Sequence, residues 1–205
     1  MEDRFFNTLK KLYGSYGFRL YIVGGSVRDL LLGRPYKDHD FVTDATPEQE
    51  KDFMPEASYA FSKFGSIRLT LEGEEIDITT LRLEGSYTDF RHPSHIQFVK
   101  DPKLDYKRRD FTINALYLDE EYQLLDYCGG VEDLNNKVIR FIGDPATRVK
   151  EDPLRILRAE RFSRVLGFSL DPKTKEAIDD NRDLLKELNP DKIKEEERKL
   201  RSSVK

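Results

Sequence analysis

The sequence predicts an α/β (α+β) fold: a domain of strands and helices over residues 1–145, then an all-helical domain over residues 146–205. Apolar and polar side chains alternate in residues 67–71 and 75–81 around a short Gly-containing turn, which predicts a β-hairpin. The apolar run 21–23 precedes paired glycines, which predicts a buried strand that turns tightly into a helix. In the last third of the chain the apolar residues recur only at helical spacing.

The other elements of the first half follow from similar patterns. Apolar residues at helical spacing predict an opening helix that ends near Gly14. Ser26 is expected to cap a helix that reaches Leu32. A second strand is predicted over residues 38–41, and a short helix over residues 47–54, where a capping Thr precedes a Pro.

The second half continues with a loop, a pair of strands and helices. Residues 85–102 contain Gly, Ser and Pro with one short apolar run, which predicts a loop. Residues 115–126 are predicted as strand, turn and strand. Charge dominates residues 192–205, and no element is predicted there. Helices are predicted over residues 131–134, 153–167 and 172–188, the second with Asp152 as its N-cap and Pro153 at its first position.

Two short motifs indicate chemistry. Gly24 and Gly25 follow a strand and precede a helix, whose first N–H groups can face an anion such as a phosphate. Asp38 and Asp40 alternate with His39 along a strand, which places both carboxylates on one side. Such a pair beside a phosphate-binding turn suits Mg²⁺ held jointly by protein and nucleoside triphosphate. Taken singly, a Gly-Gly pair before a helix is usually only a turn, and an Asp-x-Asp pair is usually only solvated strand surface; the two together are a much stronger signal.

Composition places the chain among soluble proteins, because charged residues make up 36% and apolar residues 38% of the 205. No apolar stretch has the length of a membrane span and no signal-peptide pattern is present, so the cytoplasm is the expected location. Cys128 is the single cysteine, which excludes an internal disulfide. The formal charge is −4, but basic residues gather at residues 107–109 and 148–164, which permits either a basic groove or a solvated helix face.

Four segments of the chain carry a family resemblance: IVGGSVRD (22–29), DHDF (38–41), RRDFTINA (108–115) and EDPLRILRA (151–159). They resemble the head domain of bacterial-type (class II) tRNA nucleotidyltransferases and their poly(A) polymerase relatives, in the polymerase-β-like superfamily. The resemblance covers nearly the whole chain and is weakest after about residue 189. It implies a polymerase-β-like nucleotidyltransferase head with a mixed, largely antiparallel sheet, followed by an all-helical neck.

The resemblance implies metal-dependent nucleotidyl transfer, with two Mg²⁺ ions expected. Asp38 and Asp40 are the expected catalytic metal ligands, and Asp77 on a later strand is the expected third one. The alternative for Asp77 is a solvent-facing position on a sheet with one wet face. The expected triphosphate-binding residues are Gly24, Gly25, Ser26 and Arg28.

Two further segments are expected to recognise the nucleotide. By resemblance Asp110 accepts a hydrogen bond from the ribose, with Arg109 and Asn114 in the same region; alternatively Asp110 is only a helix or turn cap. Asp152 and Arg155 are expected to read the base edge, and the alternative is an ordinary helix cap with a surface ion pair. The residues expected at the base are Asp152, Arg155, Arg158 and Arg161.

The expected function is template-independent addition of C, C and A to the 3′ end of tRNA from CTP and ATP. An A-adding or CC-adding enzyme, a poly(A) polymerase and a non-catalytic RNA-binding remnant are the alternatives. Asp89 and Arg91 lie in the expected flexible loop, where His92 stands at a position at which the family more usually has arginine. Body and tail domains of the family are not evident, and the sequence indicates neither a membrane partner nor an oligomeric state.

Overall fold

The computed structural model describes residues 3–35, 38–85 and 94–203, and the chain divides into two compact units. Unit 1 comprises the described residues of Met1–Leu83, Ile96–Arg108 and Asn114–Tyr127. Unit 2 comprises those of Glu84–His95, Arg109–Ile113 and Cys128–Lys205. The limits of these units differ from the predicted division at residue 145, and the head and neck domains stay a prediction.

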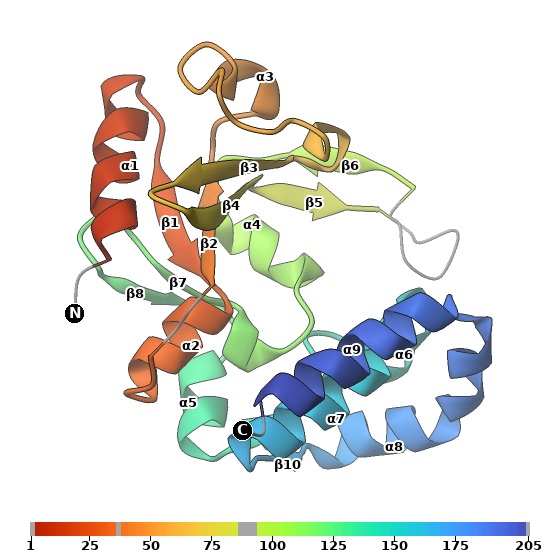
Figure 1. Ribbon diagram of the computed structural model, residues 1–205. Helices are drawn as coiled ribbons and strands as arrows, with labels where there is room; N and C mark the ends of the chain where they lie inside the picture. The colour runs from red at the N-terminus through yellow and green to blue at the C-terminus, as the bar shows by residue number, and fades with distance from the viewer. Residues whose placement is uncertain (1–2, 36–37, 86–93, 204–205) are drawn as a thin grey trace. The chain divides into compact units, whose positions relative to one another are not determined.

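Helices and strands are labelled in Figure 1. The strands are β1 (Leu20–Val23), β2 (His39–Thr43), β3 (Ser66–Leu71), β4 (Glu74–Thr80), β5 (Arg82–Glu84), β6 (Ile96–Phe98), β7 (Leu116–Leu118), β8 (Leu124–Asp126), β9 (Val138–Ile139) and β10 (Ser169–Leu170). The α-helices are α1 (Arg4–Ser15), α2 (Gly25–Leu31), α3 (Pro47–Glu50), α4 (Pro102–Asp105), α5 (Gly130–Asn135), α6 (Pro145–Glu151), α7 (Leu154–Leu166), α8 (Pro172–Asp180) and α9 (Pro190–Ser203). Among the described residues, no helix combines the length and apolar character that a bilayer crossing requires.

A six-stranded sheet in the order β3-β4-β2-β1-β7-β8 forms the centre of unit 1. β2 and β4 run parallel, and the other neighbouring strands run antiparallel, which confirms the predicted mixed, largely antiparallel sheet. β3 and β4 form the predicted hairpin. Its turn residues Glu72 and Gly73 both have positive φ, as tight hairpin turns that match the twist of the strands require.

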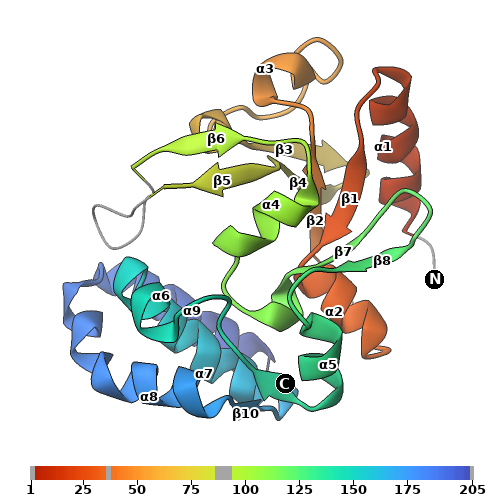
Figure 2. The same ribbon diagram turned by 180° about the vertical axis from the view of Figure 1, so that it is seen from behind.

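Helix α1 packs its apolar face on this sheet. It runs alongside β1 in both views of the molecule (Figures 1 and 2). Asp3 caps the helix, because its carboxylate accepts hydrogen bonds from two N–H groups of the first turn. The predicted opening helix is confirmed and ends at Ser15. Its buried residues are Phe5, Phe6, Leu9 and Tyr13.

Two helix starts differ from the predicted ones. α2 begins at Gly25, and Gly24 is its N-cap at a φ of 75°, so Ser26 is not the cap. At the second start, α7 begins at Leu154 and the preceding helix α6 ends with Asp152 as its C-cap. The sequence patterns missed α6, because a short helix of seven residues carries little periodic signal.

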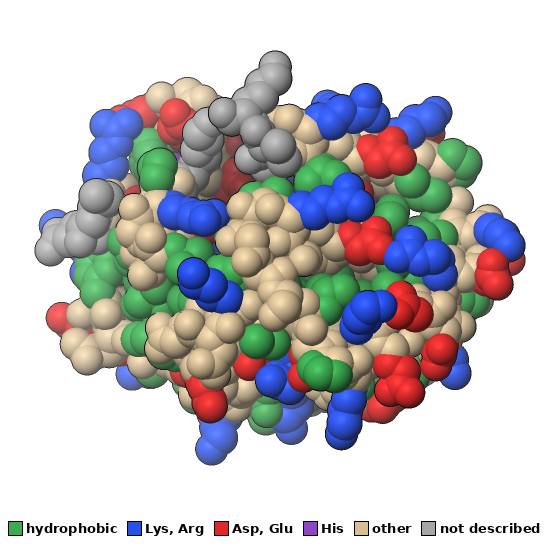
Figure 3. Space-filling model, turned by 90° about the horizontal axis from the view of Figure 1, so that it is seen from below, with side chains coloured by type: hydrophobic (Ala, Val, Ile, Leu, Met, Phe, Trp, Pro, Cys, Tyr) green, Lys and Arg blue, Asp and Glu red, His purple; other side chains and the backbone are tan. Residues whose placement is uncertain are grey.

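The end of the chain is more ordered than its composition predicted. The predicted helix over residues 172–188 stops at α8 and continues as a 3₁₀ turn over Arg182–Glu187. The charged segment that follows forms helix α9, in which residues of opposite charge pair one turn apart, as Lys199 does with Glu195 at 3.0 Å. Basic and acidic side chains are interspersed on the face drawn in Figure 3.

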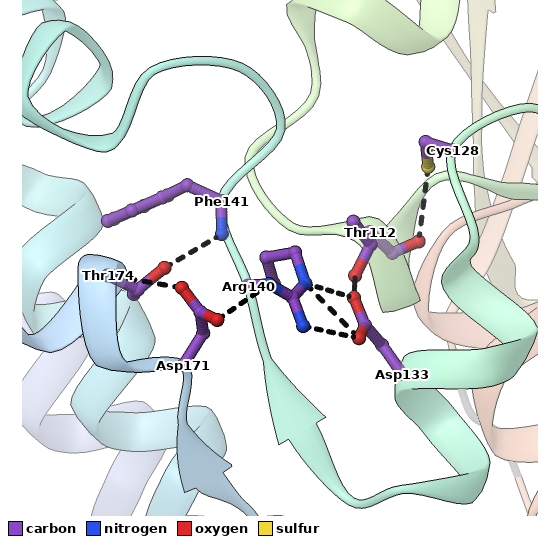
Figure 4. A network of polar contacts seen from close by, with 7 residues as sticks. All are labelled: Thr112, Cys128, Asp133, Arg140, Phe141, Asp171 and Thr174. Carbon is purple, nitrogen blue, oxygen red and sulfur yellow. Dashed lines mark hydrogen bonds and ion pairs between the residues drawn. The ribbon is translucent and has the colours of Figure 1, made fainter.

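An ionic network connects several elements of unit 2 (Figure 4). Arg140 pairs with Asp133 of α5 at 3.0 Å and with Asp171, the N-cap of α8, at 2.6 Å. Asp133 also accepts a hydrogen bond from the hydroxyl of Thr112 at 2.7 Å. The backbone N–H of Thr112 donates to the carbonyl of Arg140 at 3.1 Å. The network therefore holds the segment that contains Asp110 in place.

Glu50, at the end of α3, is a fully buried carboxyl group of unit 1. The Tyr13 hydroxyl donates a hydrogen bond to its Oε1, and among the described residues Oε2 has no hydrogen-bond partner. Burial raises the pKa of Glu50 from 4.5 to about 8, against the opposing effect of the Tyr13 hydrogen bond. Glu50 therefore keeps its proton at neutral pH in the folded chain and loses it on unfolding.

We expect the free energy of unfolding to fall as the pH rises from about 4.5 to about 8. In this window the folded chain binds one more proton than the unfolded chain. The free energy of unfolding therefore falls by up to about 1.4 kcal/mol for each pH unit. Glu50→Gln should flatten the dependence, and exposed Glu48→Gln should not. Urea titrations at several pH values in the window measure the slopes; the same slope in Glu50→Gln and the wild type would contradict the assignment.

Candidate active site

The carboxylates of Asp38, Asp40 and Asp77 line one pocket of unit 1. The register of the parallel pair β2 and β4 puts Asp40 directly opposite Asp77, and Asp38 immediately precedes β2. The pocket is open and has a volume of about 510 Å³. We call it the carboxylate pocket, and its lining residues are Asp38, His39, Asp40, Arg68, Gly73, Glu74, Glu75 and Asp77.

Ser26 connects the glycine turn to this pocket. Its buried hydroxyl donates a hydrogen bond of 2.6 Å to the backbone carbonyl of Asp38. The bond joins the first turn of α2 to the residue that precedes β2. The hydrogen bond therefore fixes the position of the Gly24-Gly25 turn relative to Asp38. Closeness in sequence alone would not do so, because a loop separates the two segments.

Arg68 of β3 holds Asp77. Its Nε and Nη2 donate to the two carboxylate oxygens of Asp77 at 2.6 and 2.9 Å, and Nη1 donates to Glu75 at 3.3 Å. The hydrogen bond and charge of Asp77 raise the pKa of Arg68, and the charges of Glu75 and Asp40 add to this effect. A bidentate pair of this geometry leaves the Asp77 carboxylate directed at Arg68.

The carboxylate pocket suits a divalent metal shared with a bound anion. Mg²⁺ usually takes one or two protein carboxylates and completes its shell with waters and phosphate oxygens. Asp38 and Asp40 supply oxygen donors of this kind at the start of β2. Within the described ranges, no group of three His, Cys, Asp or Glu side chains is arranged to hold an ion by itself. By the chemistry of their oxygen donors, Asp38 and Asp40 fit a metal whose shell a phosphate completes.

Arg28 of α2 links the glycine turn to another part of unit 1. Its Nε and Nη2 donate to the carboxylate oxygens of Asp29 at 2.8 and 2.9 Å, and its Nη1 donates to Oδ1 of Asn114 at 2.8 Å. A Cβ at Gly25 would lie 3.5 Å from Nη2, an ordinary van der Waals distance, so the guanidinium lies directly beside the glycine turn. The contacts of Arg28 with a triphosphate and of Asn114 with a ribose stay predictions.

In unit 2, Asp110 and Arg158 form an ion pair. Nε and Nη2 of Arg158 lie 2.7 and 2.6 Å from Oδ2 of Asp110, and the N–H of Phe111 donates to Oδ1 at 2.8 Å. Burial raises the pKa of Asp110, but the charge and hydrogen bond of Arg158 outweigh it, and the resulting pKa is below the ordinary value. Asp110 is therefore a carboxylate at neutral pH.

Asp152 and Arg155 lie where α6 meets α7. The sequence placed Asp152 at the N-cap of the neck helix; the N-cap is Pro153, although Oδ1 of Asp152 does accept a hydrogen bond from the N–H of Leu154 at 3.1 Å. Arg155 is buried, and its Nη1 donates at 2.8 Å both to Oε2 of Glu151 and to the backbone carbonyl of Arg148. These bonds fix one side of the Arg155 guanidinium.

The remaining predicted residues have varied positions. Arg161 donates a hydrogen bond of 2.7 Å to buried Glu196, which ties α7 to α9 within unit 2. The backbone carbonyl of Arg109 accepts a hydrogen bond of 2.7 Å from Arg148. The roles of Arg161 at the base and of Arg109 at the ribose stay predictions. Asp89 and Arg91 lie outside the described residues.

Several residues that contact the predicted site residues were not identified from the sequence. Arg68 had a usable signal, because a hairpin with the turn at residues 72–73 pairs position 68 with position 77. Asp29 lies inside the glycine motif, but only the structure shows that it binds Arg28. Glu151 also had a usable signal, because a Glu four residues before an Arg is the spacing of an ion pair on a helix.

Known proteins resemble this chain in sequence and in structure. Residues 20–140 match the family described as the poly A polymerase head domain. The CCA-adding enzyme of Lactobacillus helveticus is 47% identical over 180 residues, which are 88% of this chain and 45% of that protein. The CCA-adding enzyme of Bacillus licheniformis is 44% identical over 202 residues, 98% of this chain and 51% of that protein.

The fold is also shared with a solved structure. The crystal structure of the CCA-adding enzyme of Bacillus stearothermophilus in complex with CTP has a TM-score of 0.86 at 37% identity, and the match covers 98% of this chain and 49% of that one. The likeness confirms the predicted polymerase-β-like nucleotidyltransferase head. The chain spans about half the length of the curated relatives that it matches. Because the family match extends over more than half of the chain and includes every strand of the six-stranded sheet and every residue of the carboxylate pocket, the chain belongs to the poly A polymerase head domain family.

Proposed function

We propose that this chain is the catalytic part of an RNA nucleotidyltransferase that adds C, C and A to the 3′ end of tRNA, with CTP and ATP as substrates. The observation that carries the proposal is the carboxylate pocket, in which Asp38 is bonded to Ser26 of the glycine turn and Asp40 lies opposite Asp77. The likeness to enzymes named for CCA addition supports this choice of reaction.

In this proposal the carboxylate pocket holds the reacting phosphates. Asp38 and Asp40 bind Mg²⁺, which when present polarises the α-phosphate and neutralises the charge of the leaving pyrophosphate. The N–H groups at Gly24 and Gly25 bind the outer phosphates, because the start of a helix attracts anions. Ser26 keeps this turn at a fixed position relative to Asp38.

We further propose that unit 2 selects the nucleotide. Asp110, held as a carboxylate by Arg158, accepts a hydrogen bond from the ribose. Asp152 and Arg155 face the base edge, where an aspartate accepts from an exocyclic amine and an arginine donates to ring acceptors. In this reading, residues 1–145 transfer the nucleotide and residues 146–205 choose the base.

Incubation of the purified chain with tRNA that lacks its CCA end, Mg²⁺ and each labelled nucleoside triphosphate tests the function. Addition of two C and one A, sized on a gel, is the expected result. Addition of A alone, of C alone or of a run of A identifies an A-adding enzyme, a CC-adding enzyme or a poly(A) polymerase. Binding of tRNA without any incorporation, by a chain that is folded, contradicts catalysis.

Removal of either proposed metal ligand should abolish turnover. Asp38→Asn and Asp40→Asn keep the shape of each side chain and delete its charge, so a loss of several kcal/mol of transition-state stabilisation is expected, at least about a hundredfold in kcat/KM. Exposed Asp52→Asn is the matched control and should retain activity. Near-normal turnover by Asp40→Asn, measured with labelled ATP or CTP, would refute this role.

Base choice should depend on Asp152 and Arg155. Asp152→Ala and Arg155→Ala are expected to reduce discrimination among CTP, ATP, UTP and GTP by about tenfold or more, because a lost bidentate base contact is worth roughly 1–3 kcal/mol. The helix-cap alternative instead predicts a lower melting temperature with unchanged preference. Values of kcat/KM for the four nucleotides, measured together with melting temperature, separate the two interpretations.

Sugar choice should depend on the pair of Asp110 and Arg158. Arg158→Gln removes the two bonds that orient Asp110, so the ratio of kcat/KM for ATP over dATP should fall about fivefold to tenfold, the effect of one hydrogen bond. Arg158→Lys keeps the charge and should retain part of the ratio. Exposed Arg164→Gln on the same helix is the control. An unchanged ratio in folded Arg158→Gln would remove Arg158 from sugar selection.

A further inference from the structure

Arg68 is the basic residue of a strongly acidic pocket. Among the described residues that line the carboxylate pocket, it is the one Lys or Arg side chain, and five carboxylates surround the same space. Like charges that are held close together repel one another, and a nearby cation relieves this repulsion. Those carboxylates belong to Asp38, Asp40, Glu74, Glu75 and Asp77.

The sheet places Arg68 in line with two of the proposed catalytic carboxylates. Arg68 of β3 is the register partner of Asp77 on β4, and Asp77 is the register partner of Asp40 on β2. The three side chains therefore form a row across adjacent strands, because directly opposite residues point to the same face of a sheet. The guanidinium stands at one end of this row, and the carboxylates of Asp77 and Asp40 follow it.

Arg68 occupies the oxygens that Asp77 would offer to a metal. Both carboxylate oxygens of Asp77 accept hydrogen bonds from Arg68, at 2.6 and 2.9 Å. A carboxylate that is engaged in this bidentate manner cannot present the same lone pairs to an ion. The side chains of Arg68 and Asp77 are 44% and 43% exposed, so water screens the pair and a bound ion can displace the guanidinium.

We infer that Arg68 is a built-in counter-ion that competes with a divalent metal for Asp77 and so weakens metal binding in the carboxylate pocket. The inference rests on the proposed function, because it takes Asp38 and Asp40 as metal ligands. With Arg68 on Asp77, the metal has only the carboxylates at the start of β2. When Arg68 moves away, Asp77 becomes a third ligand, and the affinity for the ion rises.

Direct measurement of Mn²⁺ binding to the full chain tests this inference without nucleotide, RNA or turnover. Electron paramagnetic resonance measures the concentration of unbound Mn²⁺ during a titration. Competition with Mg²⁺ then gives the affinity for Mg²⁺. Arg68→Gln should bind Mn²⁺ about fivefold more tightly than the wild type, which corresponds to about 1 kcal/mol, the upper range for an exposed ion pair. A change in Tm on addition of Mg²⁺ should be larger in the same variant.

Arg4→Gln is the matched control. Arg4 forms an exposed ion pair of 2.8 Å with Glu72 in the turn of the same hairpin, but it does not belong to the residues that line the carboxylate pocket. The two substitutions remove the same charge and the same type of pair. Arg4→Gln should therefore leave the Mn²⁺ affinity unchanged, and an equal gain in both variants would mean that only net charge matters and would overturn the inference.

A double-mutant cycle identifies Asp77 as the group for which Arg68 and the metal compete. In Asp77→Asn, the further change Arg68→Gln should produce no gain, because the contested ligand is already absent. A gain that persists in Asp77→Asn overturns the inference, as does an unchanged or lower affinity in Arg68→Gln. Weaker binding of ATP by Arg68→Gln with no change in Mn²⁺ affinity would instead identify Arg68 as a phosphate ligand.

The same titration separates this inference from the proposed function. If Asp38→Asn and Asp40→Asn lose Mn²⁺ while Arg68→Gln binds as the wild type does, the metal site of the proposed function stands and the role of Arg68 is wrong. If Asp38→Asn and Asp40→Asn bind Mn²⁺ as the wild type does, the proposed metal ligands are wrong, and the inference about Arg68 falls with them.

Discussion

The parallel register of β2 and β4 is the constraint on which the candidate site depends. It sets Asp40 opposite Asp77, and buried Ile76 and Ile78 on either side of Asp77 hold that register in place. A slip of one residue would expose these isoleucines to solvent and bury the carboxylate in the core. Both changes would destabilise the fold. The hydrophobic packing of β4 therefore determines where the acidic side chains meet.

Paired arginines are the second feature of the molecule. Arg28, Arg68, Arg155 and Arg158 each donate to a carboxylate. A guanidinium that is already oriented loses less side-chain freedom when a ligand binds, because part of the ordering occurs on folding. The exposed pair of Arg68 differs from the buried bonds of Arg28 and Arg155, since water screens it and exchange of partners is easier.

In unit 2, ion pairs to an arginine likewise hold side chains in place, and here they connect several elements. The network around Arg140 joins α5, the strand segment after β9 and the N-cap of α8, and the backbone of Thr112 is bonded to it. Asp110 lies two residues before Thr112, so this network holds its chain segment. Arg158 of α7 holds the Asp110 side chain as well. Support of this kind gives a polar side chain one orientation, which selection between similar ligands requires.

The sequence by itself determined the hairpin of β3 and β4, the opening helix and the glycine and aspartate motifs, because alternation, spacing and turn residues are local signals. The register that sets Arg68 opposite Asp77 was not determined in this way, because the alternation pattern left residues 72–74 in the turn, whereas the observed turn is only residues 72–73. Only the tertiary structure decided that β2 lies beside β4, that Ser26 bonds Asp38 rather than capping α2, and that the charged end of the chain packs as α9 through Glu196. These contacts join residues that are distant in the chain. Their partners are selected by strand order and helix packing, and no local pattern encodes either of these.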